Sequence, residues 1–251
     1  MRIDVVTLFP EMFDGFLEGS LLGAARRDGR VDIRMHGLRA FADDKRQNVD
    51  DYPFGGGAGM VMKPEPIVRA IEQLTGEAEG TPLPVLLTSA QGRRYTQDMA
   101  KALAEEPRLV LVAGRYKGVD ERVIEGWITE EVSVGDYVLS GGEVAAMVLI
   151  DSVVRLLPGV VGNYESVETD SFHGLLLDGP QYTRPAEFRG RPVPSVLVSG
   201  HHEEIRRWRR REALRRTLER RPDLLGAVRL SDEDRRLMDD ILAEQDRSEQ
   251  P

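Results

Sequence analysis

A chain of 251 residues with 41% hydrophobic and 31% charged side chains is typical of a globular protein with one large domain or two modest ones. It contains no cysteine, which excludes disulfides, thiolate catalysis and cysteine-ligated zinc. The longest wholly apolar stretch, residues 144–150, is far too short to cross a bilayer, and the first residues lack the layout of a signal peptide. We therefore expect a cytoplasmic protein.

Short β-rich runs alternate with helical patterns through the first two thirds of the chain. This alternation predicts an α/β fold with a mainly parallel sheet. The expected strands are residues 3–9, 31–35, 85–88, 109–112 and 132–139. The expected helices are residues 12–27, 66–74, 96–105, 121–128 and 143–157.

Glycine-rich turns follow several of these strands. One covers residues 53–60, a second residues 113–120, and a third residues 140–142 after the last expected strand. Glycine lets backbone N–H and C=O groups come close to a ligand, and ligands of parallel sheets bind beyond the carboxyl ends of the strands. Each run alone is typical of a tight turn, but the three together predict a small-molecule pocket. At the carboxyl ends of the strands, the turns at residues 89–92, 114–118 and 140–142 are expected to cluster.

The helix expected after Gly142 carries few charges. After Glu143, only Asp151 and Arg155 are charged, so we expect this helix to be buried nearly all round, in the core or at a subunit interface.

Beyond residue 160 the composition changes, first to a polar segment and then to chain punctuated by proline. We predict an α/β domain over residues 1–160, a flexible linker over 161–175, and a small, mainly helical domain over 176–251. The last helix is expected at residues 232–243, capped by Ser231.

The net charge of −9 is spread unevenly, because residues 206–221 contain nine arginines against two glutamates. Such a basic block predicts phosphate contacts with a nucleic acid, and Trp208 could stack on a base or pack in a core. The alternative is a solvated helix face with Ile205, Trp208, Leu214 and Leu218 on its buried side.

Motifs for other chemistries are missing from the sequence. It has no phosphate-binding G-x-x-x-x-G-K-[ST] loop and no G-x-G-x-x-G after the first strand. The run from His201 to Glu204 opens an expected helix, where acidic side chains favour the helix dipole, so we do not assign a metal there.

Several long motifs in the sequence match those of a known family. They are TLFPEMF at residues 7–13, the glycine loop at 55–60, GRY at 114–116, VGDYVLSGGE at 134–143, DSF at 170–172, YTRP at 182–185 and IRRWR at 205–209. In these words the chain resembles, along nearly its whole length, the bacterial TrmD-type tRNA (guanine-N1)-methyltransferases of the SPOUT superfamily.

The resemblance implies a parallel sheet tied in a trefoil knot, S-adenosylmethionine as methyl donor, and N1 of guanosine 37 in tRNA, next to the anticodon, as acceptor. It also implies a homodimer with its active sites at the subunit interface. By resemblance, the cofactor is bound by Thr88, Ser89, Ala90, Gly114, Tyr116, Val134, Gly135, Asp136, Tyr137, Val138, Leu139, Gly141 and Gly142.

The resemblance gives two residues a catalytic role. Asp170 would be the general base that removes the N1 proton, and Arg155 would stabilise charge on the guanine O6. From the sequence alone, Asp170 could instead cap a turn and Arg155 could be a paired structural cation. The arginines assigned to RNA are Arg206, Arg207, Arg209 and Arg210.

The chain departs from the family pattern at Lys117, where relatives usually carry glutamate. Because this reverses a charge beside the cofactor, we expect weaker dependence on magnesium than the family is thought to have. Two other functions remain open: methylation of another RNA atom, such as a ribose 2′-hydroxyl, and RNA binding without catalysis.

Overall fold

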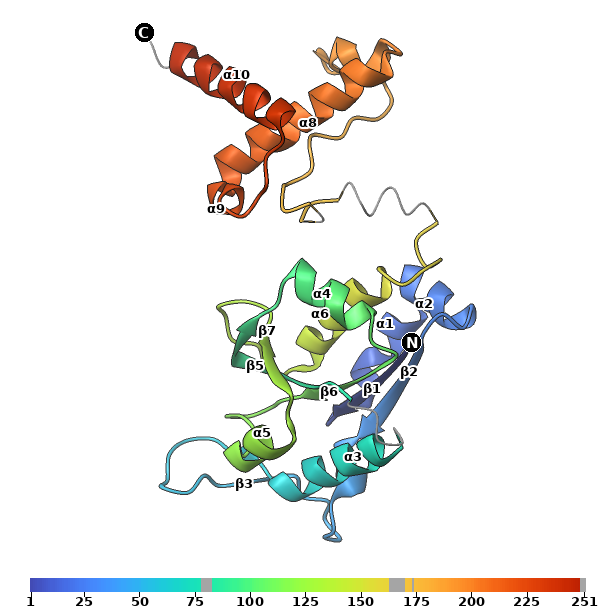
Figure 1. Ribbon diagram of the computed structural model, residues 1–251. Helices are drawn as coiled ribbons and strands as arrows, with labels where there is room; N and C mark the ends of the chain where they lie inside the picture. Colours follow the sequence, from blue (N-terminus) through green and yellow to red (C-terminus); the bar gives the residue numbers. More distant parts are fainter. Residues whose placement is uncertain (78–82, 163–169, 173, 249–251) are drawn as a thin grey trace. The chain divides into compact units, whose positions relative to one another are not determined.

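The computed structural model describes residues 1–77, 83–162, 170–172 and 174–248 (Figure 1). The chain divides into two compact units, Met1–Gly162 and Asn163–Pro251. The expected linker, residues 161–175, falls largely on 163–169 and 173, which lie outside the described residues.

The first unit is built on a five-stranded sheet in the order β2-β1-β6-β5-β7, and every pair of neighbours is parallel. Its strands are rich in valine and leucine that are buried on both faces, as parallel strands covered by helices require. The strands are β1 (Arg2–Thr7), β2 (Asp32–Gly37), β5 (Val85–Arg94), β6 (Arg108–Ala113) and β7 (Glu130–Ser133).

Helices cover both faces of this sheet and enclose two separate cores. One face carries η1 (Pro10–Phe13), α1 (Asp14–Glu18), α2 (Ser20–Arg27), α4 (Gln97–Ala104) and α6 (Glu143–Val154). The other carries η2 (Leu38–Phe41), α3 (Pro64–Gly76) and α5 (Glu121–Trp127). A two-stranded hairpin of β3 (Asp50–Asp51) and β4 (Val61–Met62) is separate from the sheet.

The second unit is mainly helical. Leu176, Leu214, Leu237 and Ile241 form its buried core between α8 and α10. Ser231 caps α10 as expected, since its hydroxyl accepts from the Asp234 amide at 3.1 Å and Asp234 accepts from the Ser231 amide at 2.9 Å. Its elements are β8 (Glu187–Phe188), β9 (Arg191–Pro192), η3 (Ser195–Val198), α8 (His202–Arg220), α9 (Pro222–Leu225) and α10 (Asp232–Ser248).

The predicted fold class is confirmed: a parallel α/β sheet flanked by helices and a helical C-terminal part, as the resemblance implies. Several local predictions were wrong. The helix expected over 12–27 is interrupted at Gly19, whose backbone is extended (ψ 154°). The strand expected over 132–139 ends at Ser133, because Gly135 turns the chain away with φ at 151°.

The turn expected at residues 89–92 is also absent. Instead β5 continues to Arg94, with a register shift against β7 between Thr88 and Arg93. A Cβ on Gly92 would lie 2.4 Å from the backbone of Glu131, so glycine allows the two strands to come this close.

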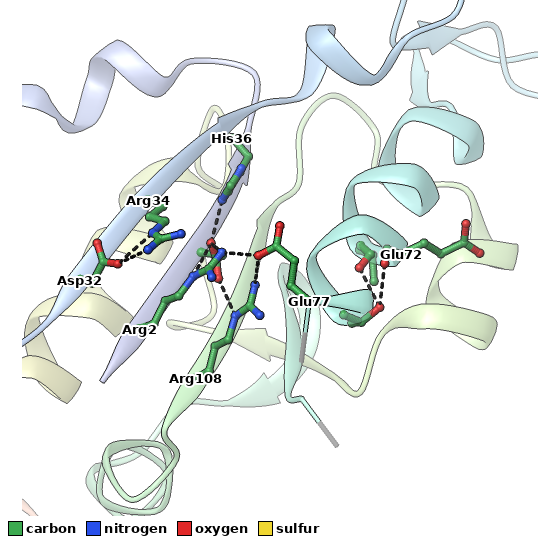
Figure 2. A network of polar contacts seen from close by, with 10 residues as sticks. Arg2, Asp32, Arg34, His36, Glu72, Glu77 and Arg108 are labelled. Carbon is green, nitrogen blue, oxygen red and sulfur yellow. Dashed lines mark hydrogen bonds and ion pairs between the residues drawn. The ribbon is translucent and has the colours of Figure 1, made fainter. Parts of the chain in front are cut away.

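A buried carboxylate organises the polar contacts at the other end of the sheet, where β1 and β6 begin. Figure 2 shows the side chains of Arg2 and Arg108 pointing toward Glu77, with His36 from β2 beside them. Asp4 is fully buried and accepts from Arg2 at 2.8 Å and from Arg108 at 2.9 Å, while the His36 Nε2 lies 2.8 Å away. Glu77 accepts from both arginines, at 2.8 and 3.2 Å. These contacts link the three strands β1, β2 and β6.

Burial alone would raise the pKa of Asp4, but the hydrogen bonds from His36, Arg2 and Arg108 outweigh it and lower the pKa to about 2. A carboxylate whose pKa falls on folding stabilises the fold above its unfolded pKa, near 3.8, and loses this effect as the pH falls towards 2. We expect Asp4→Asn to lower the free energy of unfolding at pH 7 by about 3 kcal/mol, because the two arginines lose their buried partner and keep only Glu77, whose side chain is 42% exposed. In urea titrations, the difference in the free energy of unfolding between wild type and Asp4→Asn should shrink by about 2 kcal/mol as the pH falls from 5 to 2.

Asp32→Asn is the matched control for this prediction. Asp32 pairs with Arg34 on the exposed surface of β2, so its loss should change stability by less than about 0.5 kcal/mol at any pH. Equal destabilisation by the two variants would contradict the importance given to the buried carboxylate.

Candidate active site

Two loops meet beyond the carboxyl ends of β6 and β7. The loop after β6 begins at Gly114, and the loop after β7 ends at Gly142, where α6 starts. The Gly142 amide donates to the Gly114 carbonyl at 2.7 Å, and Arg115 and Gly141 form an antiparallel β-bridge. These segments, from different parts of the sequence, therefore form one continuous backbone surface.

Close packing explains why glycines occupy this junction. A Cβ on Gly142 would lie 2.0 Å from Thr88 Oγ1 and 2.8 Å from the Gly114 amide. A Cβ on Gly141 would lie 2.4 Å from Arg115 Nε. A larger residue at Gly142 would push the loops apart, and one at Gly141 would displace the side chains of Arg115 and Glu143, so the two glycines preserve the shape of the surface.

A buried ion pair ties the same loops to the sheet. Glu143, the first residue of α6, is fully buried and accepts from Arg115 Nε at 3.0 Å. The Thr7 hydroxyl at the end of β1 donates to the other carboxylate oxygen at 3.0 Å, and the Arg115 guanidinium lies 4.2 Å from the centre of the Phe9 ring. No role for these residues was predicted from the sequence. The sequence does carry one signal for this ion pair. Glu143 is a single acidic residue at the start of an apolar helix, and a carboxylate buried there requires a cation as its partner.

The loop after β7 exposes apolar side chains beside its backbone groups. The exposed fractions of Tyr137 and Val138 are 58% and 89%, and Leu139 is also exposed. The Tyr137 hydroxyl folds back to donate to the Val134 carbonyl at 3.2 Å. Exposed apolar surface next to backbone donors and acceptors suits a flat heterocycle with a polar edge.

The glycine loop between β3 and β4 joins this surface. Gly55, Gly56, Gly57 and Gly59 all have positive φ, and the Lys117 amide donates to the Met60 carbonyl at 2.9 Å. The side chain of exposed Lys117 crosses Gly59, where a Cβ would lie 2.8 Å from the Lys117 Cγ.

Tyr116 stands beside this loop in a left-handed conformation, with φ at 62°. Burial, with the negative charge of Asp50 next in importance, raises the pKa of its hydroxyl. The phenol therefore remains protonated at neutral pH and can donate a hydrogen bond.

The structure brings most of the predicted cofactor residues together around this surface. Thr88 is buried at its base, and its hydroxyl accepts from the Gly114 amide at 3.4 Å. Ser89 and Ala90 follow it on β5, whereas Asp136 is exposed on the loop after β7. The loop residues are Gly114 and Tyr116 after β6, and Val134, Gly135, Asp136, Tyr137, Val138, Leu139, Gly141 and Gly142 after β7.

Arg155 does not lie with these loops in the single chain. It is the C-terminal cap of α6, whereas Gly142 precedes the first residue of that helix. Twelve helical residues separate the two positions, which corresponds to about 18 Å along the axis. Asp170 belongs to the second unit, outside the sheet.

The predicted RNA-binding arginines have two different environments on α8. Arg206 pairs with Glu203 and Glu233, and Arg210 pairs with Asp234, so both hold α10 against α8. Arg207 and Arg209 are exposed and join no ion pair among the described residues. Arg220 is likewise exposed and Arg216 is half-buried; neither joins an ion pair among the described residues, and together with Arg209 they follow one stripe of the helix at intervals of seven and four residues.

Trp208 packs near Tyr182, with ring centres 6.3 Å apart. It also lines a hollow between α8 and α10. The other residues of this hollow are Glu204, Arg207, Arg211, Leu237 and Asp240.

No group of three or more histidine, aspartate or glutamate side chains gathers into a metal site within the part of the chain that the structure describes. In the same part, no helix is both long and apolar enough to cross a membrane.

Comparison with known proteins gives a consistent result over nearly the whole chain. Residues 1–227 match the family described as tRNA (Guanine-1)-methyltransferase TrmD. A tRNA (guanine-N(1)-)-methyltransferase of Moorella thermoacetica is 56% identical over 96% of each chain. The proteins of the same name from Halalkalibacterium halodurans and Geobacillus kaustophilus are 51% and 55% identical, over 98% and 92% of this chain and 100% and 94% of their own. The chain belongs to the TrmD family of tRNA (guanine-N1)-methyltransferases.

Proposed function

We propose that this protein transfers a methyl group from S-adenosylmethionine to N1 of guanosine 37 in tRNA, next to the anticodon. Family membership over residues 1–227 carries this conclusion, and the joined glycine loops supply a surface for the donor. The donor contributes a methyl group bonded to a positively charged sulfur. We also propose that the reaction takes place in the cytoplasm, where tRNA is modified.

The residues at the loops fit S-adenosylmethionine. Tyr137, Val138 and Leu139 would cover the adenine ring, while backbone groups from Gly114 to Tyr116 and from Val134 to Gly142 would bind its polar atoms. The donor would thus be held by rigid backbone, which orients the methyl group towards the acceptor without ordering flexible side chains.

We infer that Asp170 accepts the N1 proton while the new N–C bond forms, and that Arg155 balances the charge that develops on O6. Both assignments come from the matching words of the family, and each residue has the charge that its role needs. Phosphates of the tRNA would be bound by Arg207 and Arg209, with Arg206 and Arg210 shaping the helix pair.

The proposed active form is a homodimer paired along α6. That helix was expected to be buried nearly all round, but Val144 and Val148, one turn apart, are each 46% exposed. An apolar stripe on a core helix favours burial against a second copy. A two-fold axis across the middle of α6 would run the helices antiparallel and bring the Arg155 end of one copy beside the Gly142 end of the other. Sedimentation velocity would distinguish one chain from two.

The proposed function is tested by methyl incorporation into two transcripts of one tRNA, with guanosine or adenosine at position 37, followed by mapping of the product atom. Incorporation at N1 of the guanosine transcript alone supports the proposal. Equal incorporation into both transcripts would place the target elsewhere, for example on a ribose 2′-hydroxyl. No incorporation into either would favour RNA binding without catalysis.

Magnesium fits this chain poorly, because Lys117 places an ammonium beside the glycine loop. We therefore expect turnover to depend on magnesium less than it does in a Lys117→Glu variant. Reversing one charge near a divalent ion should lower the half-saturating magnesium concentration about tenfold in the variant. Equally steep magnesium titrations of the two proteins would contradict this expectation.

A further inference from the structure

Asp170 stands at the start of a compact turn within the second unit. The Asp178 amide donates to the Ser171 hydroxyl at 2.9 Å, and the Phe172 amide donates to the Leu176 carbonyl at 2.8 Å. These two bonds close the chain on itself immediately after Asp170. The carboxylate is therefore attached to a folded turn on its C-terminal side.

The turn is anchored to α8. Leu176 is buried in the core with Leu214 of that helix. The next amide, that of Leu177, donates to Thr217 Oγ1 at 2.9 Å, and the Thr217 side chain is fully buried. The Thr217 hydroxyl in turn donates to the Ala213 carbonyl at 2.7 Å, so its orientation is fixed by the helix.

The backbone of the turn is held in an unfavourable shape. Phe172 and Leu175 both have positive φ, at 71° and 63°, although neither is glycine. Left-handed conformations of bulky residues persist only where the surroundings impose them, and such positions cluster at functional sites. The Phe172 ring also lies 5.9 Å from the guanidinium of Arg221, the C-terminal cap of α8.

We propose that α8 positions the catalytic carboxylate, with Thr217 as the positioning residue that joins the Asp170 turn to the helix. This inference rests on the proposed role of Asp170 as the base. The same helix carries Arg209, Arg216 and Arg220 along one stripe, and none of the three joins an ion pair among the described residues. The helix α8 thus binds the RNA backbone and also holds the general base, Asp170. Docking of the tRNA on α8 therefore places the carboxylate at the same time.

The experiment compares Thr217→Val, which keeps the shape but loses the hydroxyl, with Thr217→Ser, which keeps the hydroxyl. The single-turnover rate with saturating tRNA and S-adenosylmethionine should fall roughly tenfold in the valine variant and stay near wild type in the serine variant. The dissociation constants for tRNA and S-adenosylmethionine should change less than about twofold. Hydrogen exchange at the Leu177 amide should accelerate only in the valine variant.

Thr75→Val is the matched control. Thr75 in α3 donates to the Ile71 carbonyl in the same way, but among the described residues it holds no amide of another segment. The Thr75→Val variant should leave the single-turnover rate of methyl transfer unchanged.

The outcomes separate this inference from the proposed function. A wild-type rate in Thr217→Val, or a loss that appears only as weaker binding, overturns the positioning role. A wild-type rate in Asp170→Asn overturns the assignment of the base, and the positioning role with it. Loss in Asp170→Asn together with a slowed, serine-rescued Thr217→Val supports both.

Discussion

Asp170→Asn is expected to lower the rate of methyl transfer to guanosine 37 by at least about a hundredfold. Asparagine has nearly the same shape but cannot accept the N1 proton, and general base catalysis typically contributes a factor of about 10² to 10⁴. Binding of tRNA and of S-adenosylmethionine should remain close to wild type, because neither depends on proton transfer. Single-turnover kinetics and equilibrium binding of each substrate would measure these effects.

Asp239→Asn provides the control for this loss. Asp239 is exposed on α10 in the same unit and joins no ion pair in the described part of the chain, so removing its charge should not change the rate. If Asp170→Asn reduced tRNA affinity and left the single-turnover rate intact, the carboxylate would serve binding and the base would have to be sought elsewhere.

Glu143→Gln is expected to have the largest effect on stability. The carboxylate is 1% exposed and pairs with an arginine that is 18% exposed, so its neutralisation leaves a nearly buried guanidinium without a counter-charge. Breaking such a pair typically costs about 3 to 5 kcal/mol. Because Arg115 also spans the junction of the glycine loops, affinity for S-adenosylmethionine should fall about tenfold or more. Urea denaturation and equilibrium binding would measure the two losses.

Glu121→Gln is the matched control, because Glu121 is likewise the first residue of a helix, α5, but is exposed. It should change stability by less than about 0.5 kcal/mol. A double variant, Arg115→Met with Glu143→Gln, should recover part of the lost stability, since no uncompensated charge remains. Strictly additive losses in the double variant would show that the two residues do not act as a pair.

The sequence predicted the sheet and most of its helices because these elements have strong local signals. The interior of β6 around Val110 is a continuous apolar run, and such a run is readable without tertiary information. The boundaries failed where glycine changed the backbone: at Gly19, which interrupts a helical pattern, and at Gly135, which ends β7 early. The hairpin of β3 and β4 was missed since two-residue strands have no periodicity.

The site was predictable in part. Glycine turns after strands indicated a ligand surface, and the family words supplied the donor and acceptor. The pairing of Arg115 with Glu143, and the anchoring of the Asp170 turn on Thr217, depend on contacts between segments 28 and 40 residues apart, which no local pattern reveals. The basic block was visible as charge, but the sequence did not show which arginines would be neutralised by α10.

The pairing of these arginines with carboxylates affects how strongly the affinity for tRNA depends on salt concentration. Of the nine arginines in residues 206–221, Arg206, Arg210, Arg211, Arg215 and Arg221 already hold carboxylates among the described residues. Only arginines whose charge is free to meet phosphate displace the cations condensed on RNA, and the slope of log affinity against log salt counts those displaced cations. The carboxylates of α10 thus occupy arginines of α8 that could otherwise bind phosphate. We expect this arrangement to keep the helix pair folded and to leave the tRNA complex with the ionic-strength sensitivity of only a few phosphate contacts.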